Sequence, residues 1–256
     1  LLGTAIGICA AIALDAGTTS RLRRLLWLAV ALGLVAAAIP LTDAVLDYRA
    51  RAARFPAILD PSAPRGLVFV TSFGERVATG PLPAGLADGG TLDGVERERR
   101  ARAARERGVD PATLPPALLD PADPRARVAT NRDGHAAIVI KPERGPWPGL
   151  ALEEPAPDWR GFRALVVDLA NPTDAPLTLW FRVNDEAHDN RYEDRYDTWL
   201  ELPPRTRRRF AFPVADMQAA PDDREMRMDQ IEKVIVFHSG PAPGKRFYVL
   251  GMTLVR

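Results

Sequence analysis

The stretch Leu177-Thr-Leu-Trp-Phe-Arg-Val-Asn184 alternates aliphatic or aromatic core-type residues with more polar ones over eight positions. Side chains of a β-strand point to the two faces of the sheet in turn, so this alternation predicts a strand with one buried face. The stretch Asp197-Thr-Trp-Leu-Glu-Leu202 alternates in the same way. If the two strands pair, the residues that face away from the core share one surface. These residues are Trp180, Arg182, Trp199 and Glu201.

Similar short runs follow one another from Arg65 to the end of the chain, separated by Pro, Gly, Asn and Asp. About nine short strands without helices between them predict an all-β fold, an antiparallel β-sandwich. The expected strands are Gly66–Phe73, Ala136–Lys141, Gly149–Glu154, Arg163–Leu169, Leu177–Asn184, Thr198–Leu202, Arg207–Pro213, Lys233–His238 and Phe247–Val255. The Pro-rich segments Asn171–Pro176 and Leu202–Arg205 between them predict hairpin turns.

An apolar segment near the start predicts a membrane span. The 18 residues from Leu25 to Thr42 carry no charge and would extend about 27 Å as a helix, the hydrocarbon thickness of a bilayer. A buried helix of a soluble domain is disfavoured, because the sequence supplies no other helices to surround it. Because the chain begins at Leu1 without Met, we expect a fragment of a longer protein, with Leu1–Leu14 as a truncated spanning helix. A signal peptide is disfavoured, since it needs a basic start.

These segments divide the chain into a membrane part at 1–48, a linker at 49–64 and a β-sandwich at 65–256. Arg21, Arg23 and Arg24 abut the expected membrane helix, whereas Asp43 and Asp47 come first on its other side. Arginines are enriched on the cytoplasmic side of a membrane. We therefore expect a protein of the bacterial inner (cytoplasmic) membrane that contacts the lipid bilayer through its N-terminal helices, with the sandwich facing the periplasm or the exterior.

Composition and motifs exclude several functions. The 256 residues include 34 basic and 33 acidic ones, a balance that argues against a nucleic-acid partner. The single cysteine, Cys9, rules out an intrachain disulfide and a thiolate metal cluster. The sequence has no phosphate-binding glycine loop, nucleophile elbow or His-Glu-x-x-His motif.

An insertion at 81–124 interrupts the strand pattern. It opens with the Gly- and Pro-rich segment Pro81–Asp93, which predicts a long loop, and continues with the Arg- and Glu-rich segment Val95–Gly108. We interpret the second segment as a solvated helix with Glu/Arg pairs in preference to a patch that binds phosphate or lipid headgroups.

The predicted outer surface of the two central strands has the chemistry of a sugar-binding face. Pyranose rings stack their C–H faces on aromatic rings, while guanidinium and carboxylate groups bind the hydroxyls. Trp180 and Trp199 would provide the stacking platform, with Arg182 and Glu201 as polar partners. The alternative, in which the insertion covers this face and both tryptophans pack as ordinary interior residues, remains open at this point.

The connection between the two strands, Asn184–Asp197, is rich in acidic, basic and tyrosine residues. Its candidate ligand contacts are His188, Arg191, Tyr192, Asp194, Arg195 and Tyr196. A loop tied by Arg–carboxylate pairs is the favoured interpretation, followed by ligand contact and then by catalysis with a pair of carboxylates. The residue spacing excludes a helix–loop–helix calcium site, and a lone histidine is weak evidence for zinc, so the metal remains unknown.

A resemblance to a known family rests on a succession of motifs. These are Pro146-Trp-Pro-Gly149, Asp158-Trp-Arg-Gly-Phe162, Leu165-Val-Val-Asp168 with Asn171-Pro172, His188-Asp-Asn190, Tyr192-Glu-Asp-Arg-Tyr196 and Ile231-Glu-Lys-Val-Ile-Val-Phe237. They resemble the C-terminal domain of VanZ-like bacterial membrane proteins, which is similar to galactose-binding-like, jelly-roll carbohydrate-binding modules. The resemblance covers about Gly134 to Arg256. It implies a jelly-roll domain of the cell envelope that binds glycan. We expect no cofactor; a structural calcium is common among such modules, but the sequence names no ligand set for it.

Together these observations predict a non-enzymatic, membrane-anchored β-sandwich that binds a saccharide or cell-envelope glycan. One alternative is an envelope scaffold domain that binds other proteins through the same face. The other is a glycoside hydrolase that uses carboxylates of the 185–197 loop.

Overall fold

The computed structural model describes residues 20–67, 70–72, 78–91, 136–141, 147–238, 240 and 244–256. The chain forms two compact units, Leu1–Ala50 and Arg51–Arg256, which are described separately. The predicted truncated helix Leu1–Leu14 and the Arg-rich segment Val95–Gly108 lie outside the described residues.

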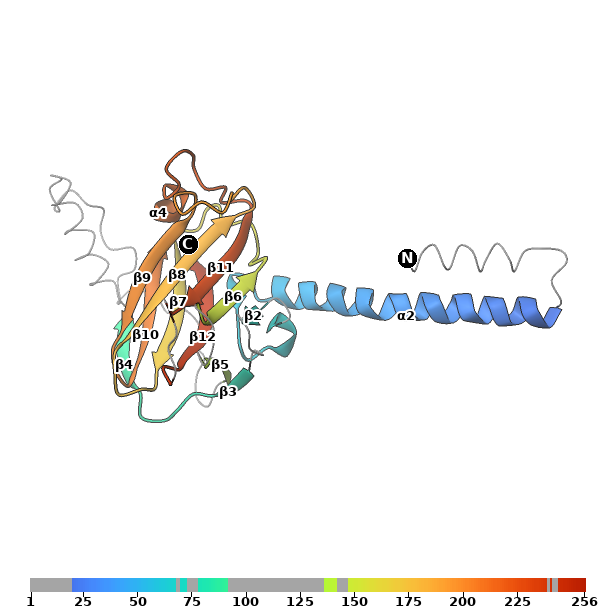
Figure 1. Cartoon of the computed structure of the whole chain (residues 1–256), viewed down its shortest axis with the longest axis horizontal. Helices are drawn as coiled ribbons and strands as arrows, with labels where there is room; N and C mark the ends of the chain where they lie inside the picture. The colour runs from blue at the N-terminus through green and yellow to red at the C-terminus, as the bar shows by residue number, and fades with distance from the viewer. Residues whose placement is uncertain are drawn as a thin grey trace. The chain divides into compact units, whose positions relative to one another are not determined.

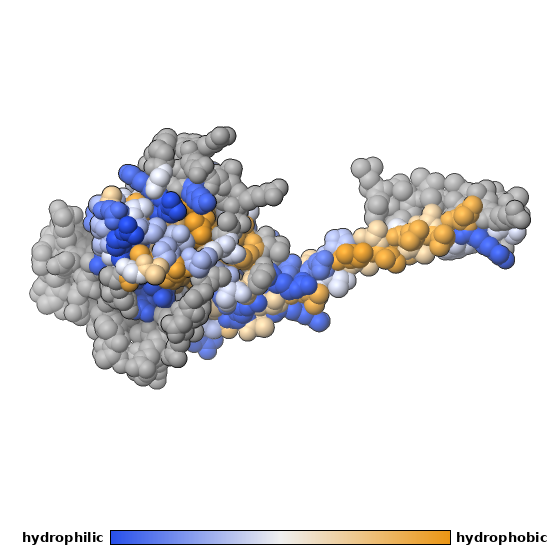
Figure 2. Space-filling view, turned by 90° about the horizontal axis from the view of Figure 1, so that it is seen from below, coloured by the Kyte–Doolittle hydropathy of each residue, from blue (hydrophilic) through white to orange (hydrophobic). Residues whose placement is uncertain are grey.

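The first unit contains a single described helix, α2 (Ser20–Ala52), which includes the predicted span Leu25–Thr42. Within it, Trp27–Ala52 is long and apolar enough to cross a membrane by length and composition, criteria that a signal sequence near an N-terminus also meets. Pro40 lies inside the helix. Figure 2 shows hydrophobic residues in orange along α2, with hydrophilic residues in blue at either end of the orange stretch.

The second unit is a sandwich of two β-sheets. Sheet A has the strand order β3-β5-β12-β7-β10-β4, with β1 also paired to β12, and sheet B has the order β2-β6-β11-β8-β9. The strands of sheet A are β1 (Ala57–Leu59), β3 (Ala78–Pro81), β4 (Ala87–Thr91), β5 (Ala136–Ile140), β7 (Ala164–Asn171), β10 (Thr206–Pro213) and β12 (Phe247–Val255). The strands of sheet B are β2 (Val70–Ser72), β6 (Gly149–Glu153), β8 (Leu177–Asp185), β9 (Tyr196–Leu202) and β11 (Ile231–Phe237).

Figure 1 shows the two sheets stacked face to face, with the short helix α4 (Val214–Gln218) at one end of the sandwich. A 3₁₀ turn, η1 (Pro64–Leu67), precedes β2. Among the strands that the structure describes, the pairs are antiparallel except for β4 with β10. The predicted all-β, antiparallel jelly-roll sandwich is confirmed.

Aromatic rings join the two sheets in the core. Phe181 of β8 stacks on Phe212 of β10 with ring centroids 4.0 Å apart and planes inclined by 7°. Tyr196 of β9 meets both rings edge-on, at 6.3 and 6.4 Å. Since aromatic side chains bury large apolar areas, this contact between sheets fixes the inward face of β8 and β9, and thereby their outward face.

The two expected hairpin turns are crossovers between the sheets. Residues 172–176 connect β7 of sheet A to β8 of sheet B, and 203–205 connect β9 of sheet B to β10 of sheet A. The buried side chain of Asn171 holds the two crossovers together: its amide nitrogen donates to the carbonyl oxygens of Ala175, Leu202 and Pro203 at 2.8–3.1 Å. Turn composition predicts a reversal of the chain, but not whether the next strand joins the same sheet.

The structure also corrects two expected boundaries. The segment 49–64, predicted as a linker, contains β1, which pairs with β12 and buries Ile58 and Leu59. The segment Pro81–Asp93, predicted as a loop, contains β4, which pairs in parallel with β10. Both strands are short, and β4 consists mainly of small and polar residues (ADGGT), so neither has a strong β-propensity signal.

Candidate functional site

The outer face of sheet B combines aromatic and charged side chains from β8 and β9. The two strands pair directly, with Trp180 opposite Trp199 and Arg182 opposite Asp197. The alternate residues Leu179, Phe181 and Leu200 are buried in the core. Trp180 is half-buried and Trp199 is 48% exposed, so the described part of the structure leaves at least one indole of this face open to solvent.

The aromatic surface extends beyond β8 and β9. Phe237 of β11 is the cross-strand partner of Trp180, and Gly149 of β6 is the next partner in the same row. Trp147, two residues before Gly149, is 53% exposed and meets the ring of Phe237 edge-on at 6.1 Å. We call Trp199, Trp180, Phe237 and Trp147 the aromatic row; it crosses the sheet perpendicular to the strands.

A glycine makes room for this row. A Cβ atom on Gly149 would lie 2.4 Å from the Cβ of Phe237 and from the carbonyl oxygen of Val236. Phe237 itself is 5% exposed and packs with Ala151, Ile235 and Trp180. The row therefore has the buried ring of Phe237 in its middle and an exposed indole, Trp147 or Trp199, at each end.

Charged groups border one side of the aromatic row. The carboxylate of Asp197 accepts a hydrogen bond from Nε of Arg182 at 2.9 Å and another from Nε of Arg195 at 2.7 Å. The guanidinium of Arg182 lies over the Phe237 ring, 5.1 Å from its centroid, and that of Arg195 lies over the Tyr192 ring at 4.2 Å. The carboxylate of Asp197 therefore joins the guanidinium groups of Arg182 and Arg195.

On the other side of the row, among the described residues of β8 and β9, the acid is Glu201. Glu201 of β9 is exposed and lies opposite Thr178 of β8, which is also exposed. The face is therefore asymmetric across the row: two cations that share one carboxylate on one side, and a carboxylate beside a hydroxyl on the other.

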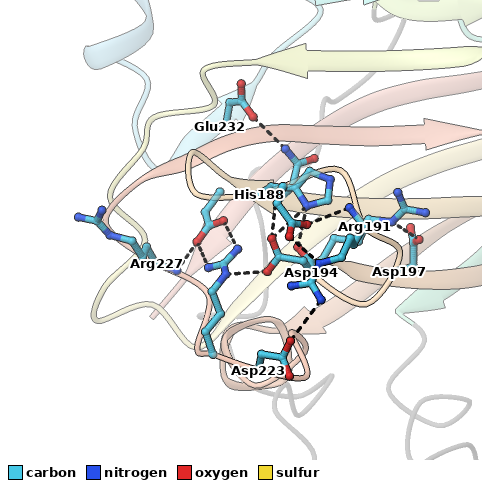
Figure 3. Close-up of polar contacts among 12 residues, drawn as sticks. His188, Arg191, Asp194, Asp197, Asp223, Arg227 and Glu232 are labelled. Atoms are coloured by element: carbon cyan, nitrogen blue, oxygen red, sulfur yellow. Dashed lines mark hydrogen bonds and ion pairs between the residues drawn. The ribbon is translucent and has the colours of Figure 1, made fainter.

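The loop between β8 and β9 is held from a distant part of the chain. Arg224 donates two hydrogen bonds of 2.7 Å to Asp185 and one of 2.6 Å to Asp194, and the backbone N–H of Arg227 donates to Asp185. The Asp185 side chain is fully buried and that of Asp194 is 6% exposed. Figure 3 shows the contacts around Asp194 and His188, with Arg191 extending to Asp223.

These contacts set the charge state of the two aspartates. Burial raises the pKa of Asp185, but the hydrogen bonds from Arg224 and from the Arg227 backbone outweigh it and leave the pKa below the usual value. The hydrogen bond from Arg224 lowers the pKa of Asp194, against the opposing effect of burial. Both groups are therefore carboxylates near neutral pH, paired with a guanidinium.

His188, Asp189 and Asp194 bring potential metal-ligand atoms within 4.8 Å of one another. Nδ1 of His188 is 2.7 Å from the carbonyl oxygen of Asp194, to which it donates. The two carboxylate oxygens of Asp194 accept hydrogen bonds from Arg224 and from the backbone of Asp189. These three residues therefore take part in hydrogen bonds that hold the loop together.

The structure separates the ten predicted contact residues into groups. The outer face of sheet B holds Trp180, Arg182, Trp199 and Glu201, and Arg195, just before β9, joins them through its hydrogen bond to Asp197. Arg191 and Tyr192 are exposed on the loop, and His188 and Asp194 lie within its hydrogen-bond network. Tyr196 lies in the core between the sheets, 7% exposed, and cannot reach a ligand on the outer face. Tyr196 is the first residue of β9, and it points inward as Thr198 and Leu200 do.

Sequence reasoning did not include Trp147, Phe237, Asp197 or Arg224 in the site. In β11 the outward residues Ile235 and Phe237 are as apolar as the inward Val234 and Val236, so alternation alone does not distinguish the faces. Trp147 precedes its strand, and Arg224 comes from 39 residues beyond Asp185. The outward position of Asp197 in its strand was the available signal for that residue.

No protein-family model matches the chain, and no curated protein matches it. Among solved structures, the chain is similar to a family 11 carbohydrate-binding module from Clostridium thermocellum in complex with a β-1,3-1,4-mixed-linked tetrasaccharide, with 12% identity, a TM-score of 0.43, and coverage of 77% of this chain and 93% of that one. The family 11 module of a cellulosomal cellulase from the same organism matches with 11% identity, a TM-score of 0.41, and coverage of 77% and 92%. An exo-β-agarase matches with 10% identity, a TM-score of 0.43, and coverage of 78% of this chain and 24% of the agarase.

Proposed function

We propose that the sandwich binds a saccharide, such as a cell-envelope glycan, on the outer face of sheet B. The observation that carries the proposal is the aromatic row, with Trp199 and Trp147 about half exposed at its two ends. Soluble domains rarely expose large aromatic groups together without a binding partner. Indole rings offer flat apolar surfaces that suit the C–H faces of pyranose rings.

The polar groups beside the row suit the hydroxyls of such a ligand. Guanidinium groups donate and carboxylates accept, and both kinds border the indoles of β8 and β9. Ion pairs with Asp197 and contacts with aromatic rings already order Arg182 and Arg195, which reduces the entropy cost of binding. In this proposal Trp180, Arg182, Trp199, Arg195 and Glu201 contact the ligand, and Tyr192 lies beside Arg195 at the margin of the face.

The chemistry of the loop supports binding over glycoside hydrolysis. A hydrolase of the two-carboxylate type needs a general acid with a raised pKa. Asp185 and Asp194 instead have lowered pKa values and bind Arg224. We therefore infer a structural, non-catalytic role for Asp185 and Asp194.

We also propose that α2 anchors the protein in the bacterial inner membrane, with the sandwich facing the periplasm or exterior. The apolar segment Trp27–Ala52 and the resemblance to VanZ-like proteins support this proposal. Alkaline carbonate extraction of bacterial membranes tests the anchor: the full chain should stay in the pellet. A Leu32→Arg/Leu34→Arg variant should be released, because each charge in the hydrocarbon costs about 2.5–3.5 kcal/mol. Release of the unaltered chain would contradict the anchor.

Calorimetry tests saccharide binding with the full chain in a zwitterionic detergent that has no sugar headgroup. The probes are cello-, laminari-, manno- and galacturono-oligosaccharides and a purified envelope polysaccharide. We expect at least one to bind, and Trp199→Ala to weaken that binding roughly two- to tenfold, since an aromatic stacking contact contributes about 0.5–1.5 kcal/mol. Trp27→Ala is the matched control, because Trp27 is 47% exposed but belongs to α2.

Absence of binding to every probe would contradict the proposal. Capture of a defined envelope protein that is lost in Trp199→Ala would then favour the scaffold alternative, in which the same face binds protein.

A further inference from the structure

Two guanidinium groups beside the aromatic row have unused donors. Arg182 and Arg195 each bind Asp197 through Nε, and their Nη nitrogens donate to no other residue in the part of the chain that the structure describes. The side chain of Arg182 is 23% exposed, that of Arg195 10%, and that of Asp197 8%. The group as a whole carries one net positive charge, with its free N–H donors at the edge of the proposed saccharide face.

Aromatic rings hold both guanidinium planes in place. Arg182 lies over Phe237, a member of the aromatic row, and Arg195 lies over Tyr192. A planar guanidinium presents paired N–H groups that match the two oxygens of a carboxylate. Because Asp197 and the rings already order the two arginines, a second carboxylate could bind without the cost of immobilising them.

Their position fits an acidic substituent on a stacked sugar. Asp197 and Arg182 are paired two residues along the strands from Trp199 and Trp180, a separation of about 6.7 Å. A pyranose that stacks on an indole extends its substituents sideways in the plane of its own ring, toward this pair. Glu201 on the opposite side of the row would repel an acid that faced it, so the two sides favour one orientation.

Two acids lie on the neighbouring strands β6 and β11. The charge of Glu153 is paired with Lys233 at 3.0 Å, whereas Glu232 keeps its charge, because the Asn184 amide that donates to it at 3.0 Å is neutral. Asp197 carries one negative charge, whereas Arg182 and Arg195 together carry two positive charges. We propose that the saccharide bound by this face is a uronate-bearing glycan, whose carboxylate binds the Nη groups of Arg182 and Arg195. This inference rests on the proposed function and specifies its ligand class.

The test compares three probes with the full chain in the same detergent: a uronate hexasaccharide (galacturonate and mannuronate forms), its carboxyl-reduced neutral counterpart, and a sulfated neutral hexasaccharide. We expect the uronate to bind about tenfold more tightly than its reduced counterpart, as for one charge-assisted contact. Raising the salt from about 0.05 to 0.5 M should remove much of this difference.

Arg195→Gln should lower the uronate affinity more than the neutral affinity, so that the tenfold preference for the uronate is lost, and Arg195→Lys should retain part of the preference. Arg205→Gln is the matched control, because Arg205 forms an exposed pair with Asp174 at a crossover. A melting temperature equal to that of the unaltered protein shows that Arg195→Gln folds.

The outcomes separate the two proposals. Equal affinity for the uronate and its reduced counterpart would overturn the acidic-ligand inference and leave saccharide binding intact. Tighter binding of the sulfated probe than of the uronate would overturn the assignment to carboxylate. No binding of any of the three, together with none in the wider panel, would overturn saccharide binding itself.

Discussion

Tyr196 and Trp199 lie three residues apart on the same strand and have opposite environments. Tyr196 packs in the core against Phe181 and Phe212, whereas Trp199 is on the outer face and half exposed. Since strand side chains alternate, an odd separation places two residues on different faces. The position of a residue in the strand, more than its type, decides whether an aromatic ring supports the fold or is available to a ligand.

Gly149 is the residue at which the aromatic row depends most closely on backbone geometry. Gly149→Ala would place a Cβ atom 2.4 Å from Phe237, so the β6–β11 contact would have to shift. We expect the free energy of unfolding to fall by about 2–3 kcal/mol, measured by urea denaturation followed by tryptophan fluorescence.

Gly80→Ala is the control for this substitution. Its nearest neighbour would be Cγ2 of Val139 at 3.5 Å, an ordinary contact. Equal stability of the two variants would show that the crowding at Gly149 is relieved at little cost.

At the scale of elements, the loop between β8 and β9 depends on Arg224. This single side chain binds Asp185 at the end of β8 and Asp194 in the loop. Arg224→Met leaves two buried carboxylates without their cation, so we expect the free energy of unfolding to fall by about 3–5 kcal/mol. Thermal and urea denaturation measure the loss.

Arg205→Met serves as the comparison, because its pair with Asp174 is exposed and should contribute little. If Arg224→Met were as stable as Arg205→Met, the network would not hold the loop.

The same pair of aspartates predicts how stability changes with pH. Their folded-state pKa values are lowered, so their contribution is complete above the unfolded value of about 3.9 and is lost as the pH falls through the lower folded values. We expect the melting temperature to decrease as the pH is lowered past about 4. The difference between wild type and Arg224→Met should narrow over that range in circular-dichroism melts; a constant difference down to pH 2 would contradict the assignment.

At the scale of the whole molecule, the sandwich begins earlier than the composition of the chain suggests. β1 pairs with β12 and buries Ile58 and Leu59, and Phe55 meets Phe162 edge-on at 5.3 Å. A fragment that starts at residue 65 loses these contacts. We expect it to be less stable than residues 51–256 by about 3–6 kcal/mol, the value of burying two aliphatic side chains, as measured by urea denaturation.

Ile58→Ala/Leu59→Ala in the longer fragment should reproduce most of that loss. Equal stability of the two fragments would show that the segment before residue 65 is a linker after all.

Sequence by itself determined the features that repeat over short distances. The alternation in β8 and β9 specified which side chains face outward, and it placed Trp180, Arg182, Trp199 and Glu201 on one surface. The length of the apolar run Leu25–Thr42 indicated a helix long enough to cross a membrane, and α2 (Ser20–Ala52) contains this run. These features follow from strand and helix geometry, which each residue shares with its immediate neighbours.

Tertiary structure alone decided which distant segments meet. The pairing of β11 and β6 with β8 added Phe237 and Trp147 to the aromatic row, and the segment after α4 supplied Arg224. The crossovers at 172–176 and 203–205 depend on Asn171, whose contacts with Leu202 and Pro203 span more than 30 residues. Which strands pair depends on how whole faces pack across the core. This packing involves segments far apart in the sequence, so a local sequence pattern does not predict it.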